Sequence, residues 1–209
     1  MRERALRFTL VLALLASVSI GLTASSVPFK AAITAAPVPL QWSAFELLAA
    51  GYSRLFGVVD IRTEQFFAWL RDDRPVLLID VREPQEQSVS VMPGAIAVGV
   101  DTDIAALPAV RAFRAQHAGN QRARIVVYCA AGYRSGRSIA RANKAHPAEE
   151  EQVPFINLRG GIISYANAGG RLLTPAGQPT QKVHGYNESW SQYLKKPAEP
   201  PLPPAVPGA

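Results

Sequence analysis

Residues 125–135, IVVYCAAGYRS, form the segment that decides the fold of this chain. The apolar, β-branched run at residues 125–128 follows the polar segment 119–124, a pattern that predicts a buried strand. The Ala, Arg and Lys residues after Ser135 favour a helix, with Ser135 as its N-cap. Between strand and helix stands Cys129, the only cysteine among 209 residues. The segment therefore predicts a strand, a tight turn that carries a thiol, and a helix.

This arrangement gives the thiol an environment suited to anions. A helix start leaves backbone N–H groups without intrahelical partners, and after a strand these groups converge on the centre of the turn. Their dipoles and Arg134 favour the thiolate of Cys129 and would hold an anion attached to it. Alternatively, Cys129 is a small buried apolar residue at a strand end. Gly132, which permits the turn, and Arg134, which is costly to bury without an anion, favour the reactive interpretation.

Residues 129–135, CAAGYRS, resemble the active-site loop Cys-x-x-Gly-x-Arg-Ser/Thr of single-domain rhodaneses. Three further segments resemble motifs of that family in the same order: LLIDVREP at 77–84, MPGAI at 92–96 and NLRGGI at 157–162. The resemblance spans about residues 59–173. The chain departs from the family pattern at Val91, where the family usually has His, and at Tyr165-Ala166-Asn167, where it usually has Trp.

The resemblance implies a three-layer α/β rhodanese-like domain with a central, mostly parallel sheet flanked by helices. It implies a sulfurtransferase in which the Cys129 thiolate takes the outer sulfur of a donor such as thiosulfate and passes it from a persulfide to a thiol or cyanide. Six loop residues are then expected to bind the substrate: Ala130, Ala131, Gly132, Tyr133, Arg134 and Ser135. Ser135 is expected to cap the helix rather than to bond to the sulfur. Asp80 and Arg82 are expected to support the loop as a structural pair rather than as acid–base groups.

The hydrophobic pattern outside these motifs predicts the same class of fold. Strands are predicted at residues 58–61, 75–81, 95–100, 125–128 and 153–158. Helices are predicted at residues 63–70, within 101–117, at 135–145 and at 162–168. Such alternation is typical of a mostly parallel sheet with right-handed crossovers. Because ligands in open α/β sheets lie at the carboxyl ends of strands, Asp80 and Cys129 are expected at one rim.

Residues 1–24 predict export. Three arginines among the first seven residues form a basic n-region, and residues 8–20 form an apolar h-region followed by small residues. We favour a cleaved signal peptide over an uncleaved membrane anchor, although residues 6–22 are nearly long enough to span a bilayer. The mature protein is therefore expected in the periplasm or outside the cell, and only the N-terminal segment is expected to meet a membrane. A lone cysteine in an exported protein is either a reactive thiol or an intermolecular link.

Two extensions flank the rhodanese-like domain, which is expected to occupy residues 58–173. Residues 25–57 are expected to hold a proline-containing linker and then a helix from Ser43. Five apolar residues recur there at roughly helical spacing: Trp42, Phe45, Leu47, Leu48 and Leu55. This helix either packs on the domain, which we favour, or docks a partner.

The C-terminal extension, residues 174–209, is expected to begin with turns. A short helix is predicted within residues 186–195, packed through Trp190, Tyr193 and Leu194. From Lys196 onwards, six prolines forbid regular structure and predict an extended or disordered tail.

Composition and spacing exclude several other functions. The formal charge of +6 suits small anionic substrates or acidic partners, but the aromatic interleaving and zinc motifs of nucleic-acid-binding proteins are missing. The three histidines are far apart in sequence and have no second ligand type at metal spacing, so neither a metal nor a cofactor is expected. Four residues separate Cys129 from Arg134, whereas related cysteine phosphatases use five, so phosphatase activity is not expected.

A persulfide carrier that serves a dedicated partner protein remains the alternative to an enzyme acting on small molecules. Arg137, Arg141 and Lys144 would lie along one face of the helix after the cysteine loop and could dock an acidic partner. The same three residues also suit an ordinary solvated face.

Overall fold

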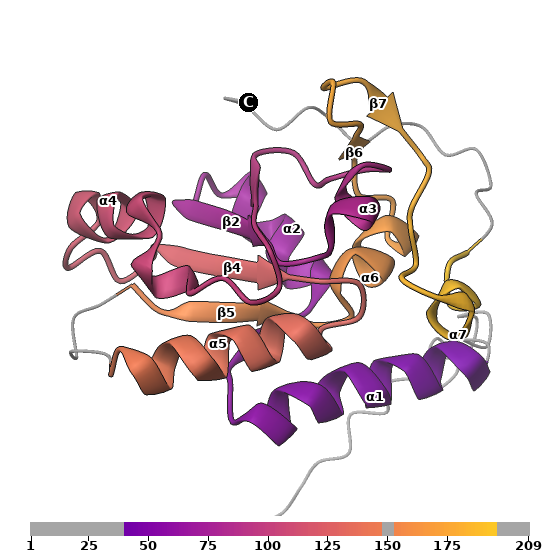
Figure 1. Ribbon diagram of the computed structural model, residues 1–209, viewed down its shortest axis with the longest axis horizontal. Coiled ribbons are helices and arrows are strands. Elements are labelled where there is room, and N and C mark those ends of the chain that lie inside the picture. Colours follow the sequence, from indigo (N-terminus) through magenta and orange to yellow (C-terminus); the bar gives the residue numbers. More distant parts are fainter. Residues whose placement is uncertain (1–39, 148–152, 196–209) are drawn as a thin grey trace, which may run out of the picture. The chain divides into compact units, whose positions relative to one another are not determined.

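The computed structural model describes residues 40–147 and 153–195 (Figure 1). The predicted signal peptide, most of the proline-containing linker and the proline-rich tail lie outside these residues. None of the helices in the two described ranges combines the length and the apolarity that crossing a membrane requires.

Five strands form the central sheet in the order β1-β5-β4-β2-β3. Their bounds are β1 (Asp60–Ile61), β2 (Val76–Asp80), β3 (Ala95–Ala97), β4 (Arg124–Tyr128) and β5 (Phe155–Leu158). All four pairings are parallel, as the predicted alternation of strands and helices indicated. Asp80, the last residue of β2, pairs in register with Tyr128, the last residue of β4. Asp80 and Cys129 therefore lie at one rim of the sheet, as predicted.

Helices cover both faces of the sheet, which confirms the three-layer α/β architecture (Figure 1). Their bounds are α1 (Leu40–Phe56), α2 (Thr63–Arg71), α3 (Pro84–Gln87), η1 (Ile104–Ala106), α4 (Pro108–Gln116), α5 (Tyr133–Ala145), α6 (Gly161–Asn167) and α7 (Glu188–Ser191). Ile125 and Val127 of β4 pack in the cluster that includes α4 and α5. Val126 and Tyr128 pack in the cluster that includes α2 and α6. Both faces of β4 are buried, which accounts for its continuous apolar run.

Several predicted boundaries were wrong by a few residues. β3 ends at Ala97 rather than Val100, and β5 begins at Phe155, after Pro154. The helical segment predicted within residues 101–117 consists of η1 and α4, because Leu107 is not helical and Pro108 begins a new helix.

The N-terminal helix packs on the domain, as we favoured, but of the apolar residues named above whose side chains the structure describes, only Phe45 is fully buried in the contact. α1 begins at Leu40 rather than Ser43 and lies along α5 (Figure 1). Phe45, Ala49 and Ser53 are buried, whereas Leu47 and Leu55 are 74% and 67% exposed. The leucine pattern did not identify this face, because α1 contacts α5 through small residues, which allow two helices to approach closely. Gly136 of α5 makes the same point, since a Cβ there would lie 3.0 Å from the ring of Phe56.

The C-terminal extension returns to the cysteine loop. Its strand β7 (Pro179–Thr180) pairs antiparallel with β6 (Leu172–Leu173), which directly precedes the extension, and α7 follows. Trp190, Tyr193 and Leu194 pack, as predicted, against a cluster of four buried residues: Phe45, Ala130, Ala131 and Ile163. Two members of that cluster directly follow Cys129, so the extension is part of the surroundings of the loop.

Candidate active site

Cys129 leaves the end of β4 and is enclosed by its own loop. Its side chain lies in the core, and the residue is 1% exposed. The backbone N–H of Gly132 donates to Cys129 Sγ at 3.2 Å, and the hydroxyl of Ser135 lies 3.5 Å from the same sulfur. The sulfur therefore accepts a hydrogen bond from a backbone N–H inside a short loop, which is an arrangement that stabilises negative charge on it.

Gly132 turns the chain from this loop into α5. Its φ of +98° lies in the left-handed region, where a residue without a Cβ avoids strain. Gly132 is the N-cap of α5, so the prediction that Ser135 caps the helix was wrong. Ser135 lies within the first turn instead, and its hydroxyl donates to Asn157 Oδ1 at 2.7 Å. A side-chain cap is unnecessary here because the glycine supplies the turn.

The first turn of α6 holds the other side of the loop. The backbone N–H groups of Ile162 and Ile163 donate to the carbonyl oxygens of Cys129 and Ala130 at 2.9 and 3.2 Å. Gly161 makes this approach possible, since a Cβ there would lie 2.1 Å from the Cys129 carbonyl oxygen. The Gly-Gly turn of the fourth motif thus fixes the backbone of the cysteine loop.

Asn157 is a buried site residue to which the sequence analysis gave no role. Its side chain accepts the Ser135 hydroxyl, donates to the Gly132 carbonyl oxygen at 3.0 Å and donates to Ser53 Oγ at 3.0 Å. It therefore joins β5, the cysteine loop and α1. A lone polar residue within an otherwise apolar strand was the signal that could have identified it.

Asp80 and Arg82 form the structural ion pair that the sequence suggested. Arg82 Nη2 lies 2.7 Å from Asp80 Oδ2, and both side chains are fully buried. The Arg82 guanidinium also donates to the Ser90 carbonyl oxygen at 2.6 Å, and the Tyr128 hydroxyl donates to Asp80 Oδ2 at 2.7 Å. Burial opposes the charge on Arg82, but hydrogen bonds to Asp80 leave its pKa above the ordinary value. Arg82 therefore keeps its charge, and its hydrogen bonds fix the segment that follows β2.

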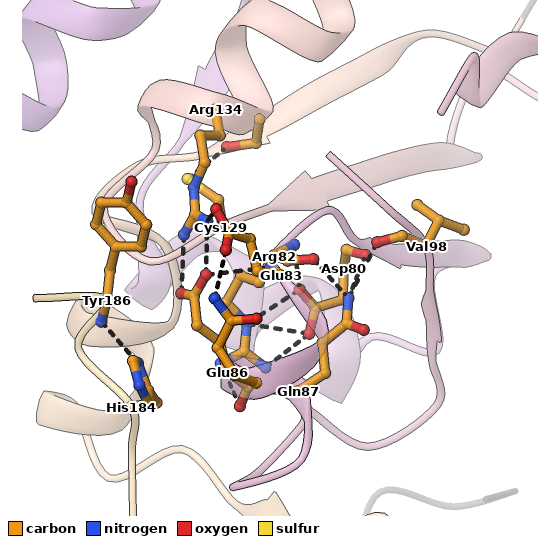
Figure 2. Close-up of polar contacts among 12 residues, drawn as sticks. Asp80, Arg82, Glu83, Glu86, Gln87, Val98, Cys129, Arg134, His184 and Tyr186 are labelled. Carbon is orange, nitrogen blue, oxygen red and sulfur yellow. Dashed lines mark hydrogen bonds and ion pairs between the residues drawn. The ribbon is translucent and has the colours of Figure 1, made fainter. Parts of the chain in front are cut away.

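The structure adds a second ion pair, between Arg134 and Glu86 (Figure 2). Arg134 Nη1 and Nη2 lie 2.5 and 2.8 Å from the two carboxylate oxygens of the buried Glu86, and Glu83 lies 3.8 Å away. Burial opposes the charge on Arg134, but Glu86 and then Cys129 raise its pKa above the ordinary value. Arg134 is therefore always positively charged, and the carboxylates of Glu86 and Glu83 neutralise part of that charge. Burial of Glu86, two residues after the segment LLIDVREP, was not evident from the sequence.

The remaining loop residues contribute packing. Ala130 and Ala131 are buried against Phe45 and Ile163. Tyr133 is 41% exposed, and its ring lies edge-on to Tyr52 and Phe56 of α1. The structure therefore brings together all six loop residues that the sequence named. The side chains of Ala130, Ala131 and Tyr133 pack against neighbouring helices rather than against the sulfur. Among the described residues, no three His, Cys, Asp or Glu side chains are grouped so as to hold a metal ion.

Comparison with known proteins gives this architecture its family. The sequence pattern of the rhodanese-like domain family matches residues 48–168, which is more than half of the chain. The chain therefore belongs to the rhodanese-like domain family. A protein of Allochromatium vinosum named sulfurtransferase is 31% identical over 123 residues, which cover 57% of this chain and 99% of that protein. Together these findings place the chain in a family of sulfurtransferases and persulfide carriers.

Solved structures with a similar fold share less sequence. A rhodanese-like domain protein of Staphylococcus aureus is 21% identical with a TM-score of 0.40, over 52% of this chain and 91% of that chain. A thiosulfate sulfurtransferase of Pseudomonas aeruginosa is 21% identical with a TM-score of 0.45, over 71% of this chain and 26% of that chain.

Proposed function

We propose that this protein is a sulfurtransferase that moves sulfane sulfur from a small anionic donor such as thiosulfate to a thiol or to cyanide. The observation that carries the proposal is the position of Cys129 Sγ, which accepts the Gly132 N–H, one of the backbone donors at the start of α5, at 3.2 Å inside its loop. A persulfide on Cys129 would place its anionic terminal sulfur among such donors.

The reaction proceeds in two displacements. The Cys129 thiolate attacks the outer sulfur of thiosulfate, an Sγ–S bond forms, the S–S bond of the donor breaks, and sulfite leaves with the electron pair. An acceptor thiolate or cyanide then attacks the terminal sulfur of the persulfide. The Sγ–S bond breaks, its electron pair returns to Cys129, and the acceptor leaves as a persulfide or thiocyanate. This sequence gives ping-pong kinetics.

The ion pair of Arg134 supports a second candidate, a persulfide carrier for a partner protein. Both terminal nitrogens of Arg134 are engaged by Glu86, and Glu83 adds further negative charge nearby. The attraction that Arg134 offers to a dianionic donor is therefore weaker than that of an unpaired arginine. A donor that brings a persulfide on another protein would depend less on this attraction.

Two measurements test the proposal and separate the candidates. Incubation with thiosulfate should increase the intact mass of the protein by one sulfur atom, and Cys129→Ser should abolish both this addition and turnover while leaving the fold unchanged. Substantial turnover by the serine variant would refute the role of Cys129. Rapid loading from protein persulfides without loading from thiosulfate would favour the carrier.

We also propose that the mature protein is exported, on the basis of its basic and apolar N-terminal sequence. Its lone cysteine is then a thiol that works outside the cytoplasm, where an acceptor must be available in reduced form.

A further inference from the structure

Tyr186 brings a residue from outside the matched family domain onto Arg134. The Cζ atom of Arg134 lies 4.3 Å from the centroid of the Tyr186 ring, within the range of a cation–π contact. Figure 2 shows the Tyr186 ring beside the guanidinium, with Glu86 also in contact with it. The carboxylate holds the edge of the planar cation through two hydrogen bonds, and the ring covers its surface. The guanidinium is therefore constrained in two independent ways.

The backbone of Tyr186 is strained in making this contact. Its φ is +75°, and only Asp73 shares a positive φ among the non-glycine residues of the described ranges. A bulky side chain in the left-handed region is strained, because its Cβ lies too close to the backbone. Tyr186 remains 41% exposed, so burial of apolar surface does little to offset this strain. Such outliers persist only where the surrounding structure fixes them.

The neighbouring residues fix this conformation from both sides. On one side, the backbone N–H of Tyr186 donates to His184 Nδ1 at 3.0 Å. On the other side, the Asn187 side chain caps α7 by accepting the Trp190 N–H at 3.1 Å. The rings of Trp190 and Tyr193 lie against Phe45, which anchors the segment beside the cysteine loop. The extension thus presents a rigid tyrosine to Arg134.

Figure 2 shows the Cys129 side chain beside the Arg134 guanidinium, and in agreement with this placement Cys129 is among the groups that raise the pKa of Arg134. A less ordered guanidinium would spend more time in water and stabilise the Cys129 thiolate less. Any group that orders Arg134 therefore acts on the sulfur at a distance.

We propose that Tyr186 is a positioning residue, which holds the Arg134 guanidinium toward Cys129 and so increases the reactivity of the thiolate. The role of Tyr186 in sulfur transfer rests on the function proposed above. The predicted effect on the thiol, however, does not depend on which sulfur donor the protein uses. It follows that the C-terminal extension is a working part of the active site.

The experiment uses alkylation by iodoacetamide, which reports on Cys129 alone because the chain has no other cysteine. Tyr186→Ala and Tyr186→Gly both remove the ring, but only glycine relieves the left-handed strain. We expect both variants to react about two- to fivefold more slowly at neutral pH, with the pH profile moved upwards, whereas Tyr186→Phe keeps the ring and stays near the wild-type rate. The glycine variant should nevertheless melt at a higher temperature than the alanine variant. Equal alkylation rates in wild type, Tyr186→Ala and Tyr186→Gly would overturn the proposal.

A second comparison tests whether Tyr186 acts through Arg134. Because loss of Arg134 alone would leave Glu86 buried and unpaired, the background is the double variant Arg134→Met with Glu86→Gln. Adding Tyr186→Ala to this background should leave the alkylation rate unchanged, and a further two- to fivefold loss would overturn the proposed route. Asp73→Gly is the matched control for strain, because Asp73 also has a positive φ. Asp73 precedes β2, at the end of that strand opposite to Asp80 and the cysteine loop. This variant should leave alkylation unchanged.

The same variants distinguish this proposal from the proposed function. If the wild type takes no sulfur from any donor but the alkylation rates differ as expected, the proposed function fails and the positioning role of Tyr186 stands. If sulfur transfer proceeds while the Tyr186 variants alkylate at the wild-type rate, the positioning role fails and the proposed function stands.

Discussion

Replacement of Glu86 by Gln would break the ion pair between α3 and the helix after the cysteine loop. Glu86 has no exposed side-chain surface, and the Arg134 side chain is 12% exposed. The variant leaves the cation of Arg134 beside a neutral amide, one of whose two terminal groups is itself a donor and cannot accept from the guanidinium.

The magnitude follows from burial. Removal of one partner of a buried ion pair costs about 3–5 kcal/mol, and the partial exposure of Arg134 allows water to recover some of this, so we expect a loss of about 2–4 kcal/mol. For a chain of this size a loss of about 3 kcal/mol corresponds to a fall in Tm of about 6–12 °C. Urea denaturation followed by circular dichroism measures the free energy, and differential scanning calorimetry measures the Tm.

The control removes both partners. Arg134→Met combined with Glu86→Gln leaves no fully buried charge unpaired, because the Glu83 side chain is 35% exposed, so the double variant should recover at least half of the lost stability. The reasoning would be refuted if Glu86→Gln cost less than about 1 kcal/mol, or if the double variant were no more stable than the single one.

Three further predictions concern the loop, the core and export. Gly161→Ala should prevent the native loop from forming, because the added Cβ would meet the Cys129 carbonyl oxygen. Gly177→Ala, also at positive φ but in open space, should only lower the Tm by a few degrees. Folding of both variants to similar extents would contradict this prediction. Burial raises the pKa of Tyr165 to about 12, from an ordinary value of 10.0, so the folded state keeps its phenol proton longer than the unfolded state. The stability that Tyr165 contributes by keeping its proton is complete below pH 10 and is lost as the pH rises towards 12. Between pH 8 and 11, Tyr165→Phe should therefore lose about 1.4 kcal/mol less stability than the wild type, as urea titrations would measure. Cell fractionation should find the protein outside the cytoplasm, and recovery from the soluble cytoplasm with Met1 retained would refute export.

Elements with strong local signals were predictable. The buried strands β2 and β4 follow from continuous apolar runs, and the alternation of strands with helices predicts a parallel sheet. Cys129 and Gly132 stand out because a lone thiol and a glycine between strand and helix are unusual. Even the pair Asp80 and Arg82 was accessible, since the two residues are neighbours in the chain.

Predictions failed where a residue was assigned by its local context alone. Ser135 is a good N-cap by type, but Gly132 had already begun the helix and Asn157 takes the serine hydroxyl. In α1 the apolar pattern correctly included Phe45, but Leu47 and Leu55 are exposed. Ala49 and Ser53 complete the packed face, because close helix contact selects small side chains as well as apolar ones.

The sequence by itself determined the class of fold, the position of the cysteine and the loop that encloses it, because these depend on residues adjacent in the chain. Only the tertiary structure decided what surrounds the loop. Glu86 and Tyr186 meet Arg134 from segments 48 and 52 residues away, and Asn157 joins β5 to α1 across 104 residues. No local pattern encodes such contacts, because they exist only once the sheet has brought the ends of its strands, α1 and the C-terminal extension to one rim.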